Sequence, residues 1–86
     1  MEVHYSSGFK KQYKKLSPST QLRFKDRLRT FIRNPRAPQL RYHKLHGEYA
    51  GLWSINITGD IRAVIDVSHK GGVLFIAIGS HSQLYG

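Results

Sequence analysis

The spacing of hydrophobic residues in the first half of the chain has a helical period. Phe9, Tyr13 and Leu16 follow one another at i, i+4 and i+7, which places them on one face of a helix. The same period returns further along at Phe24, Leu28, Phe31 and Ile32. Both segments are therefore expected to be helices that turn one apolar side to a common core.

Proline and serine mark where these helices begin and end. Ser17-Pro18 is typical of a helix start, with Ser as the N-cap and Pro at the first helical position, where its missing N–H costs nothing. Asn34-Pro35 ends the second run because proline cannot continue a helix. We predict a helical hairpin over residues 8–16 and 18–33.

In the second half the apolar period changes to two, which predicts strands. Trp53 to Ile57 and Ile61 to Val67 alternate, and Val73 to Ile78 is nearly all apolar, as in an inner strand covered on both faces. Residues 3–5 allow a short first strand. Residues 34–48 contain two prolines and little periodicity, so we expect a connecting loop there.

The alternation also predicts the register of the hairpin around residues 58–60. A two-residue turn would set Arg62 opposite Ile55 or Ile57 and place its guanidinium on the apolar face. A three-residue turn over 58–60 instead pairs Ile55 with Ala63 and sets Asn56 beside Arg62 on the other face. We therefore predict the three-residue turn, which collects polar groups on one face of the sheet.

These elements predict one α+β domain over residues 1–86, since 86 residues are too few for two cores. Their order is β-α-α-β-β-β, with a small antiparallel sheet and the two-helix hairpin packed on one face. The other face of the sheet would remain partly open to a ligand.

Charge is unevenly distributed along this domain. The net charge is +9, and residues 1–44 hold 12 of the 14 Lys and Arg residues. A domain this basic is expected to bind polyanions, nucleic acid first and acidic protein second. The absence of cysteine excludes a disulfide framework, an iron–sulfur centre and a thiol nucleophile. No apolar run approaches a membrane span and no secretion signal is recognisable, so we expect a cytoplasmic protein without membrane contact.

Two side chains in the second half are candidates for chemistry. His81 follows the most apolar strand, and an imidazole can donate or accept a proton near neutral pH. The alternative is a histidine that caps the strand end. Arg62 sits in mid-strand, where its planar donors suit a phosphate. The alternative is a salt bridge to an acidic residue, namely Asp66, Asp60 or Glu48.

Other histidines and tyrosines are candidates for contacts with RNA. His43 and His46 form an H-x-x-H pair, but no third ligand stands at a diagnostic spacing, so we expect no metal and favour proton transfer or RNA contact. Tyr42, Tyr49 and Tyr85 lie off the core stripes and are available to stack on bases.

Three segments, together with the order of elements, resemble the RelE/ParE toxin superfamily. They are HKLHG at 43–47, GDIRAVI at 59–65 and GSHSQLY at 79–85. The nearest branch is similar to YafQ-type mRNA endonucleases. The resemblance implies a RelE-like fold and a toxin of a type II toxin–antitoxin system. It implies ribosome-dependent cutting of mRNA without cofactor or metal: the 2′-OH attacks the phosphate, leaving a 2′,3′-cyclic phosphate and a 5′-OH.

The resemblance also implies roles for particular residues. His81 matches the catalytic histidine that serves as general acid, and Arg62 matches the arginine used on the scissile phosphate. His43 and Asp60 match a loop histidine and an acidic turn residue, and both are expected to be catalytic. Tyr85 matches an aromatic residue at the substrate.

Two positions depart from the YafQ pattern. Asn56 replaces a strand histidine and can hydrogen-bond a 2′-OH or phosphate but cannot be a base. Ala77 replaces an arginine, whose task would pass to Arg62.

Further substrate contacts are expected from the basic residues His46, Lys11, Lys15 and Arg41.

The expected partners are a short acidic or amphipathic antitoxin, the ribosome, and mRNA or rRNA held through phosphate contacts. Two alternatives within the same fold remain open. One is a ParE-like inhibitor of DNA gyrase, which would need no proton-transfer groups. The other is an RNA-binding relic with weak or no catalytic activity.

Overall fold

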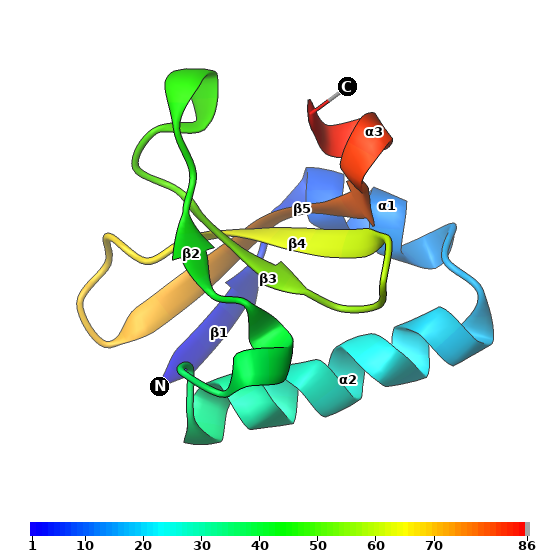
Figure 1. Ribbon diagram of the computed structural model, residues 1–86, viewed down its shortest axis with the longest axis horizontal. Helices are drawn as coiled ribbons and strands as arrows, with labels where there is room; N and C mark the ends of the chain where they lie inside the picture. Colours follow the sequence, from blue (N-terminus) through cyan, green and yellow to red (C-terminus); the bar gives the residue numbers. More distant parts are fainter. Residues whose placement is uncertain (86) are drawn as a thin grey trace.

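A five-stranded mixed sheet forms the centre of the structure (Figure 1), a computed structural model that describes residues 1–85. Two longer helices cover one face of the sheet, which confirms the predicted α+β class. The elements in chain order are β1 (Glu2–Tyr5), α1 (Ser7–Lys14), α2 (Pro18–Arg33), β2 (His43–Lys44), β3 (Trp53–Asn56), β4 (Ile61–Asp66), β5 (Gly72–Ser80) and α3 (His81–Tyr85), with 3₁₀ turns at Pro38–Leu40 and Gly47–Tyr49.

The predicted helical hairpin is confirmed, and so is its start signal. Ser17 caps α2 by accepting a hydrogen bond from the Thr20 N–H at 3.3 Å, and Pro18 is the first helical residue. Ser6 caps α1 in the same way, at 3.0 Å from the Phe9 N–H.

Aromatic rings from the two helices and the sheet form the core. Phe9 and Phe24 lie with their ring centroids 5.6 and 5.3 Å from that of Phe75, and all three side chains are buried. Tyr42, expected to be free for stacking on bases, instead lies flat against Trp53 with centroids 4.3 Å apart. Its ring therefore belongs to the edge of the core, which is a correction to the expectation.

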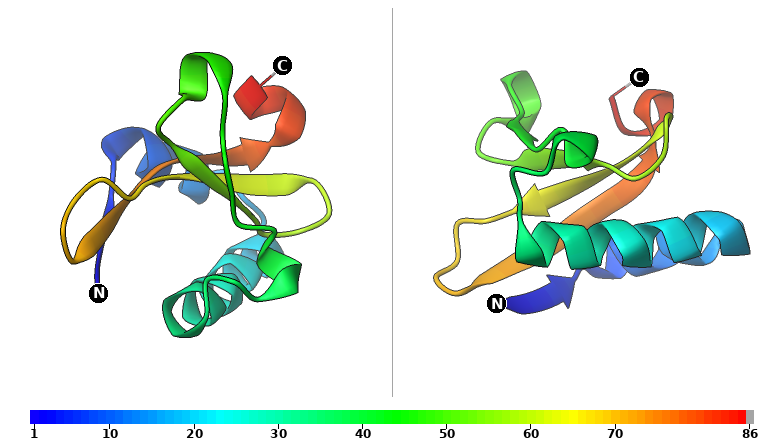
Figure 2. Two further views of the ribbon diagram at one scale, coloured as in Figure 1. Left: turned by 60° about the vertical axis from the view of Figure 1, so that its left-hand side comes forward. Right: turned by 60° about the horizontal axis from the view of Figure 1, so that its bottom comes forward.

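The hairpin between β3 and β4 has the register that the sequence predicts. Ile55 pairs with Ala63 and Asn56 with Arg62, and the Ile57 N–H donates to the Ile61 carbonyl at 2.8 Å. Ile55, Ala63 and Ile65 belong to the core under the helices, whereas Asn56 and Arg62 face the opposite side, which they share with Val64. In Figure 2 that opposite side carries α3 and the turn at Gly47–Tyr49.

The sheet differs from the prediction in three respects. The strand order is β1-β5-β4-β3-β2, and β1 runs parallel to β5, so the sheet is mixed rather than antiparallel. A parallel pair requires a long crossover, which the rest of the domain supplies. The expected loop over 34–48 contains the edge strand β2, whose two residues are too few to alternate. After β5 the chain forms the short helix α3, which the predicted order β-α-α-β-β-β does not include.

A bulge in β5 explains why its burial does not alternate. Val64 pairs with Ala77 and Ile65 with Phe75, which leaves Ile76 as an extra residue on β5. Phe75 and Ile78 consequently both face the core. Helix α1 is attached to this bulge, because the Ser6 hydroxyl donates to the Ile76 carbonyl at 2.7 Å.

Candidate active site

A depression of about 300 Å³ lies on the sheet face opposite α1 and α2. It collects side chains from β2, β3, β4 and α3 and from the segments beside β2. Its lining consists of Arg41, His43, Leu45, Ser54, Asn56, Arg62, His81 and Tyr85. Six of these are residues that the sequence analysis proposed for catalysis or substrate binding, and they come from positions up to 44 residues apart.

The strand pairing explains why these side chains meet. His43 stands opposite Ser54, and Asn56 stands opposite Arg62, so all four are cross-strand neighbours on one face. Arg62 is in turn paired with Gly79 on β5. A row of polar side chains therefore crosses the sheet and ends at a residue without a side chain.

Gly79 gives α3 the space to fold back over β5. A Cβ atom at this position would lie 2.9 Å from Gln83 Oε1 and 3.6 Å from Leu84 Cδ2. Gln83 Oε1 is held in place because it accepts a hydrogen bond from the Ser80 N–H at 2.8 Å. The turn after β5 is thus tight, and it brings the first residue of α3, His81, to the depression.

The Arg62 guanidinium holds the β3–β4 turn with one of its nitrogens. Nη1 donates to the carbonyls of Thr58 and Gly59 at 3.0 and 3.1 Å. Within residues 1–85, no acidic side chain forms an ion pair with Arg62, and its hydrogen bonds all start from Nη1. The salt-bridge alternative is therefore wrong in this structure, and Nη2 and Nε remain for an anionic ligand.

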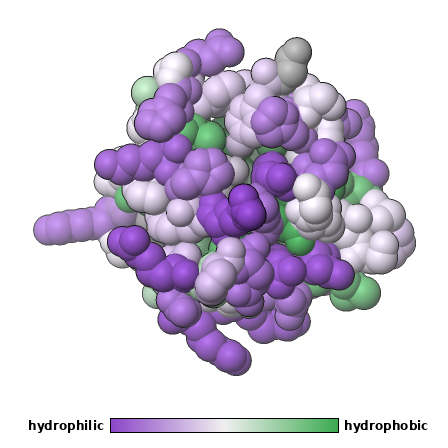
Figure 3. All heavy atoms as spheres, viewed as in Figure 1, coloured by the Kyte–Doolittle hydropathy of each residue, from purple (hydrophilic) through white to green (hydrophobic). Residues whose placement is uncertain are grey.

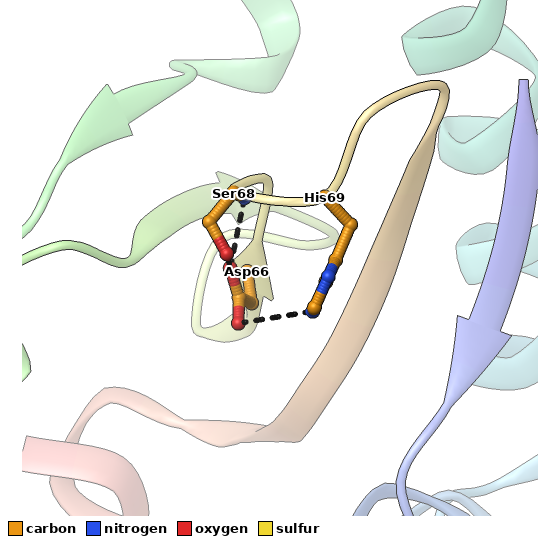
Figure 4. Close-up of polar contacts among 3 residues, drawn as sticks. All are labelled: Asp66, Ser68 and His69. Carbon is orange, nitrogen blue, oxygen red and sulfur yellow. Dashed lines mark hydrogen bonds and ion pairs between the residues drawn. The ribbon is translucent and has the colours of Figure 1, made fainter.

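Asp66, one of the proposed partners of Arg62, is occupied in the β4–β5 turn (Figure 4). Its Oδ1 accepts hydrogen bonds from the Ser68 hydroxyl at 2.7 Å and from the Ser68 N–H at 2.9 Å. Oδ2 lies 3.9 Å from His69 Nε2. The hydroxyl and backbone hydrogen bonds from Ser68 lower the pKa of Asp66 below its usual value.

We expect this turn to lose stability in acid. A carboxyl with a lowered folded-state pKa stabilises the fold above its unfolded-state pKa, and that stabilisation disappears as the pH falls through the folded-state pKa. Asp66→Asn should flatten the decrease in unfolding free energy below about pH 4 and cost no more than about 1 kcal/mol at pH 7, because the group is near solvent. Urea unfolding between pH 2 and 7 measures both effects. An unchanged acid slope would contradict the assignment.

His81 combines a structural backbone with an accessible ring. Its N–H donates to the Asp60 carbonyl at 3.3 Å, so the backbone joins α3 to the β3–β4 turn. The side chain is exposed and packs edge-on against Tyr85, with centroids 5.0 Å apart. The ring forms no hydrogen bond with any of residues 1–85, which leaves both nitrogens accessible.

Two tyrosines hold α3 against the sheet. The Tyr85 hydroxyl donates to Ser54 Oγ at 3.3 Å, and the Tyr49 hydroxyl donates to the Leu84 carbonyl. Their rings meet edge-on with centroids 5.4 Å apart. Tyr49 is thereby engaged in fixing α3 rather than free to stack on a base, and Tyr85 lines the depression from a fixed position.

The remaining sequence-predicted residues lie outside the lining of the depression. Asp60 is an exposed turn residue whose carbonyl, rather than its carboxylate, contacts α3. His46 is exposed just before the turn at Gly47–Tyr49. Lys11 is exposed on α1, and Lys15 is exposed at its C-terminal cap. Lys15 lies beside Gln83 of α3 in a separate hollow of about 260 Å³.

Ser54 and Leu45 also line the depression, although they were not among the residues predicted from the sequence. Ser54 is 1% exposed, and a serine on an alternating strand gives no sign of being buried. The available signal was its place two residues before Asn56, on the polar face of the predicted hairpin.

The surroundings of the site are polar. In Figure 3, which has the same view as Figure 1, hydrophilic side chains cover most of the visible surface, including the side of the molecule on which β2 lies. Among residues 1–85, no three His, Asp or Glu side chains are grouped so as to hold a metal ion. None of the helices described for residues 1–85 combines the length and apolarity required to cross a bilayer.

Comparisons with known proteins identify a family that matches the sequence and solved structures that have a similar fold. The family model for the ParE toxin of type II toxin–antitoxin systems (parDE) matches residues 3–85. A search among curated proteins found no match.

Similar solved structures include a YoeB/ParE toxin from Agrobacterium tumefaciens, with 26% identity, 94% of this chain and 99% of that chain covered, and a TM-score of 0.78. YafQ from E. coli strain BL21(DE3) has 19% identity, coverage of 99% and 98%, and a TM-score of 0.83. The toxin–antitoxin complex RelBE2 from Mycobacterium tuberculosis includes a chain with 17% identity, coverage of 93% and 96%, and a TM-score of 0.75.

Proposed function

We propose that this chain, which belongs to the ParE toxin family of type II toxin–antitoxin systems, cuts mRNA on the ribosome. One observation carries this proposal. Two histidines, His43 and His81, line the same depression as Arg62, whose hydrogen bonds within residues 1–85 all start from Nη1. Two proton-transfer groups and a fixed cation are the groups that metal-independent cleavage of a phosphodiester requires.

The proposed reaction is an internal transesterification of RNA. His43 accepts the proton of a ribose 2′-OH, whose oxygen attacks the adjacent phosphorus. Arg62 stabilises the extra negative charge on the phosphate oxygens in the transition state. His81 donates a proton to the departing 5′-oxygen, so the products are a 2′,3′-cyclic phosphate and a 5′-OH. His43 then releases its proton to bulk water and His81 takes one up from water, so each histidine regains its starting state.

Substrate binding falls to the polar neighbours of these groups. The Asn56 amide can donate to a phosphate or accept from a 2′-OH, but it cannot act as a base. Arg41 adds a second guanidinium to the lining. Tyr85 offers the edge of a fixed ring to a base. We retain Asp60, His46, Lys11 and Lys15 as contacts with ribosomal RNA or mRNA around the depression.

Mapping of mRNA 5′ ends tests the proposal. The protein added to a translating extract should produce cuts at fixed positions relative to codons, and the new 5′ ends should carry a hydroxyl. The family model that matches is named for ParE, which favours inhibition of DNA gyrase as the second candidate. Loss of supercoiling activity with intact mRNA would support that candidate instead. If the protein caused neither mRNA cleavage nor loss of supercoiling, an inactive relic would be supported.

The antitoxin is the second part of the proposal, and an apolar groove between α1 and α2 suits it. Tyr5, Phe9, Tyr13, Phe24 and Leu28 line this groove, and Lys10, Lys14 and Lys25 surround it. No acidic side chain is in the lining of the groove within the described chain. An amphipathic segment with an acidic polar side would match both its apolar floor and its charged rim.

Reversing the rim charge should weaken this complex. The double variant Lys14→Glu/Lys25→Glu is expected to raise the Kd for the antitoxin encoded beside the toxin roughly 10-fold or more, since the rim would repel an acidic segment. Titration calorimetry at two salt concentrations measures the change. The matched control is Lys70→Glu, in the β4–β5 turn, which should leave the Kd unchanged. Equal effects of both variants would exclude the groove as the docking surface.

A further inference from the structure

Arg41 has an unusual backbone conformation directly beside the depression. Its φ and ψ are both 47°, in the left-handed region, and no other non-glycine residue between 1 and 85 has a positive φ. An L-residue in this region brings its Cβ close to a carbonyl oxygen, which is unfavourable. Such a conformation persists only where the surrounding structure enforces it, and it is enriched at functional sites.

The residues on either side of Arg41 enforce the conformation. Leu40 is fully buried, and Tyr42 is stacked on Trp53. The Arg41 N–H donates to the Pro38 carbonyl at 3.2 Å, which closes the 3₁₀ turn before it. With both neighbours anchored in the core, Arg41 is the residue at which the chain reverses towards β2.

This conformation aims the Arg41 carbonyl at the next histidine. The carbonyl oxygen lies 2.6 Å from His43 Nδ1. A carbonyl only accepts hydrogen bonds, so Nδ1 must carry the proton. In the neutral ring, Nε2 is then the nitrogen with the free lone pair, and a base requires such a lone pair.

We propose that Arg41 is a positioning residue whose backbone carbonyl holds His43 in the Nδ1–H tautomer, leaving Nε2 to accept the 2′-OH proton. The proton acceptor role rests on the proposed ribonuclease function, whereas the tautomer does not. Pairing of His43 with Ser54 fixes the backbone beneath the ring, and the carbonyl fixes the ring itself.

Two substitutions separate the backbone of Arg41 from its side chain. Arg41→Gly removes the guanidinium but keeps a residue that adopts the left-handed region freely. Arg41→Val also removes the guanidinium, and its β-branched side chain strongly disfavours that region. A difference between the two variants therefore reports on the backbone alone.

The test is ¹⁵N NMR of the histidine rings in the full chain, at a pH where His43 is neutral. The wild type and Arg41→Gly should show a pyrrole-like Nδ1 and a pyridine-like Nε2 at His43, and Arg41→Val should show a tautomer mixture or the opposite tautomer. In single-turnover cleavage, Arg41→Val should be roughly 10-fold slower than Arg41→Gly.

The outcomes separate this inference from the proposed function. An Nε2–H tautomer at His43 in the wild type overturns the inference, whatever the protein does to RNA. The wild-type spectrum decides this even if Arg41→Val does not fold. If His43 has the Nδ1–H tautomer but the protein cuts no RNA, the positioning role of Arg41 is supported and the proposed ribonuclease function is wrong. If the wild type and folded Arg41→Val have the same His43 tautomer, the backbone conformation of Arg41 does not set that tautomer and the inference is overturned.

Discussion

Replacing His81 with alanine is expected to slow single-turnover cleavage of ribosome-bound mRNA by roughly 10²- to 10⁴-fold, the usual contribution of a general acid. The physical reason is that the 5′-oxygen is a poor leaving group unless it receives a proton as the P–O bond breaks. The His81 ring is exposed to the depression and makes no hydrogen bond with residues 1–85 that would have to break first. Quenched-flow cleavage on programmed ribosomes measures the rate.

A modified substrate distinguishes the loss of the acid from a displaced helix. An mRNA with sulfur in place of the bridging 5′-oxygen has a leaving group that departs without a proton. His81→Ala should therefore cut this substrate nearly as fast as the wild type does. His69→Ala is the matched control, since His69 is an exposed histidine in the β4–β5 turn and outside the depression. If His81→Ala remains slow on the sulfur substrate, the role of His81 is not that of the general acid.

Replacing Arg62 with alanine is expected to slow the same step by roughly 10²-fold or more, as does removal of a donor that stabilises transition-state charge in other enzymes. The loss should appear in the cleavage step rather than in ribosome binding, because Arg62 offers Nη2 and Nε to a charge that grows during the reaction. Arg62→Lys should recover only part of the rate, since an ammonium lacks the planar pair of donors. Single-turnover rates at saturating protein give the comparison.

Stability must be measured beside activity for this variant. The Nη1 atom of Arg62 holds the carbonyls of Thr58 and Gly59, so its removal should also cost about 1 kcal/mol of unfolding free energy. Arg36→Ala, at an exposed position outside the depression, removes an equal charge and should affect neither quantity. Wild-type cleavage by folded Arg62→Ala would remove Arg62 from the mechanism.

Local chemistry made parts of this fold predictable. The N-cap at Ser17 and the proline after it are properties of neighbouring residues, so the start of α2 follows from sequence. The β3–β4 register was predictable because one alternative would have buried the Arg62 guanidinium. That single exclusion also placed Asn56 and Arg62 together on the face where the depression lies.

Features that depend on distant contacts were not predictable in this way. The direction of β1 is set by its pairing with β5, some 70 residues later in the chain. The bulge at Ile76 shows no sequence signal because every residue around it is apolar. The left-handed backbone at Arg41 results from the burial of Leu40 and the stacking of Tyr42, and both are tertiary contacts.

The candidate site was likewise predictable only in part. The resemblance of three short segments to a toxin superfamily brought His43, Arg62, His81 and Tyr85 into one hypothesis, and the structure places all four around one depression. Asp60 and His46, taken from the same segments, lie outside the lining, and their roles stay predictions. The role of Ser54 and Tyr49 in holding α3 depends on the helix folding back over the sheet, which the sequence does not show.

The groove between the helices and the depression open on opposite faces of a sheet only one layer thick. An inhibitor seated in the groove would leave the catalytic surface uncovered. Such an inhibitor would act through its bulk, by keeping the toxin from binding the ribosome, and the residues of the depression would be unchanged. A dinucleotide small enough to diffuse to the bare surface would then be bound equally well by the free toxin and by the neutralised complex.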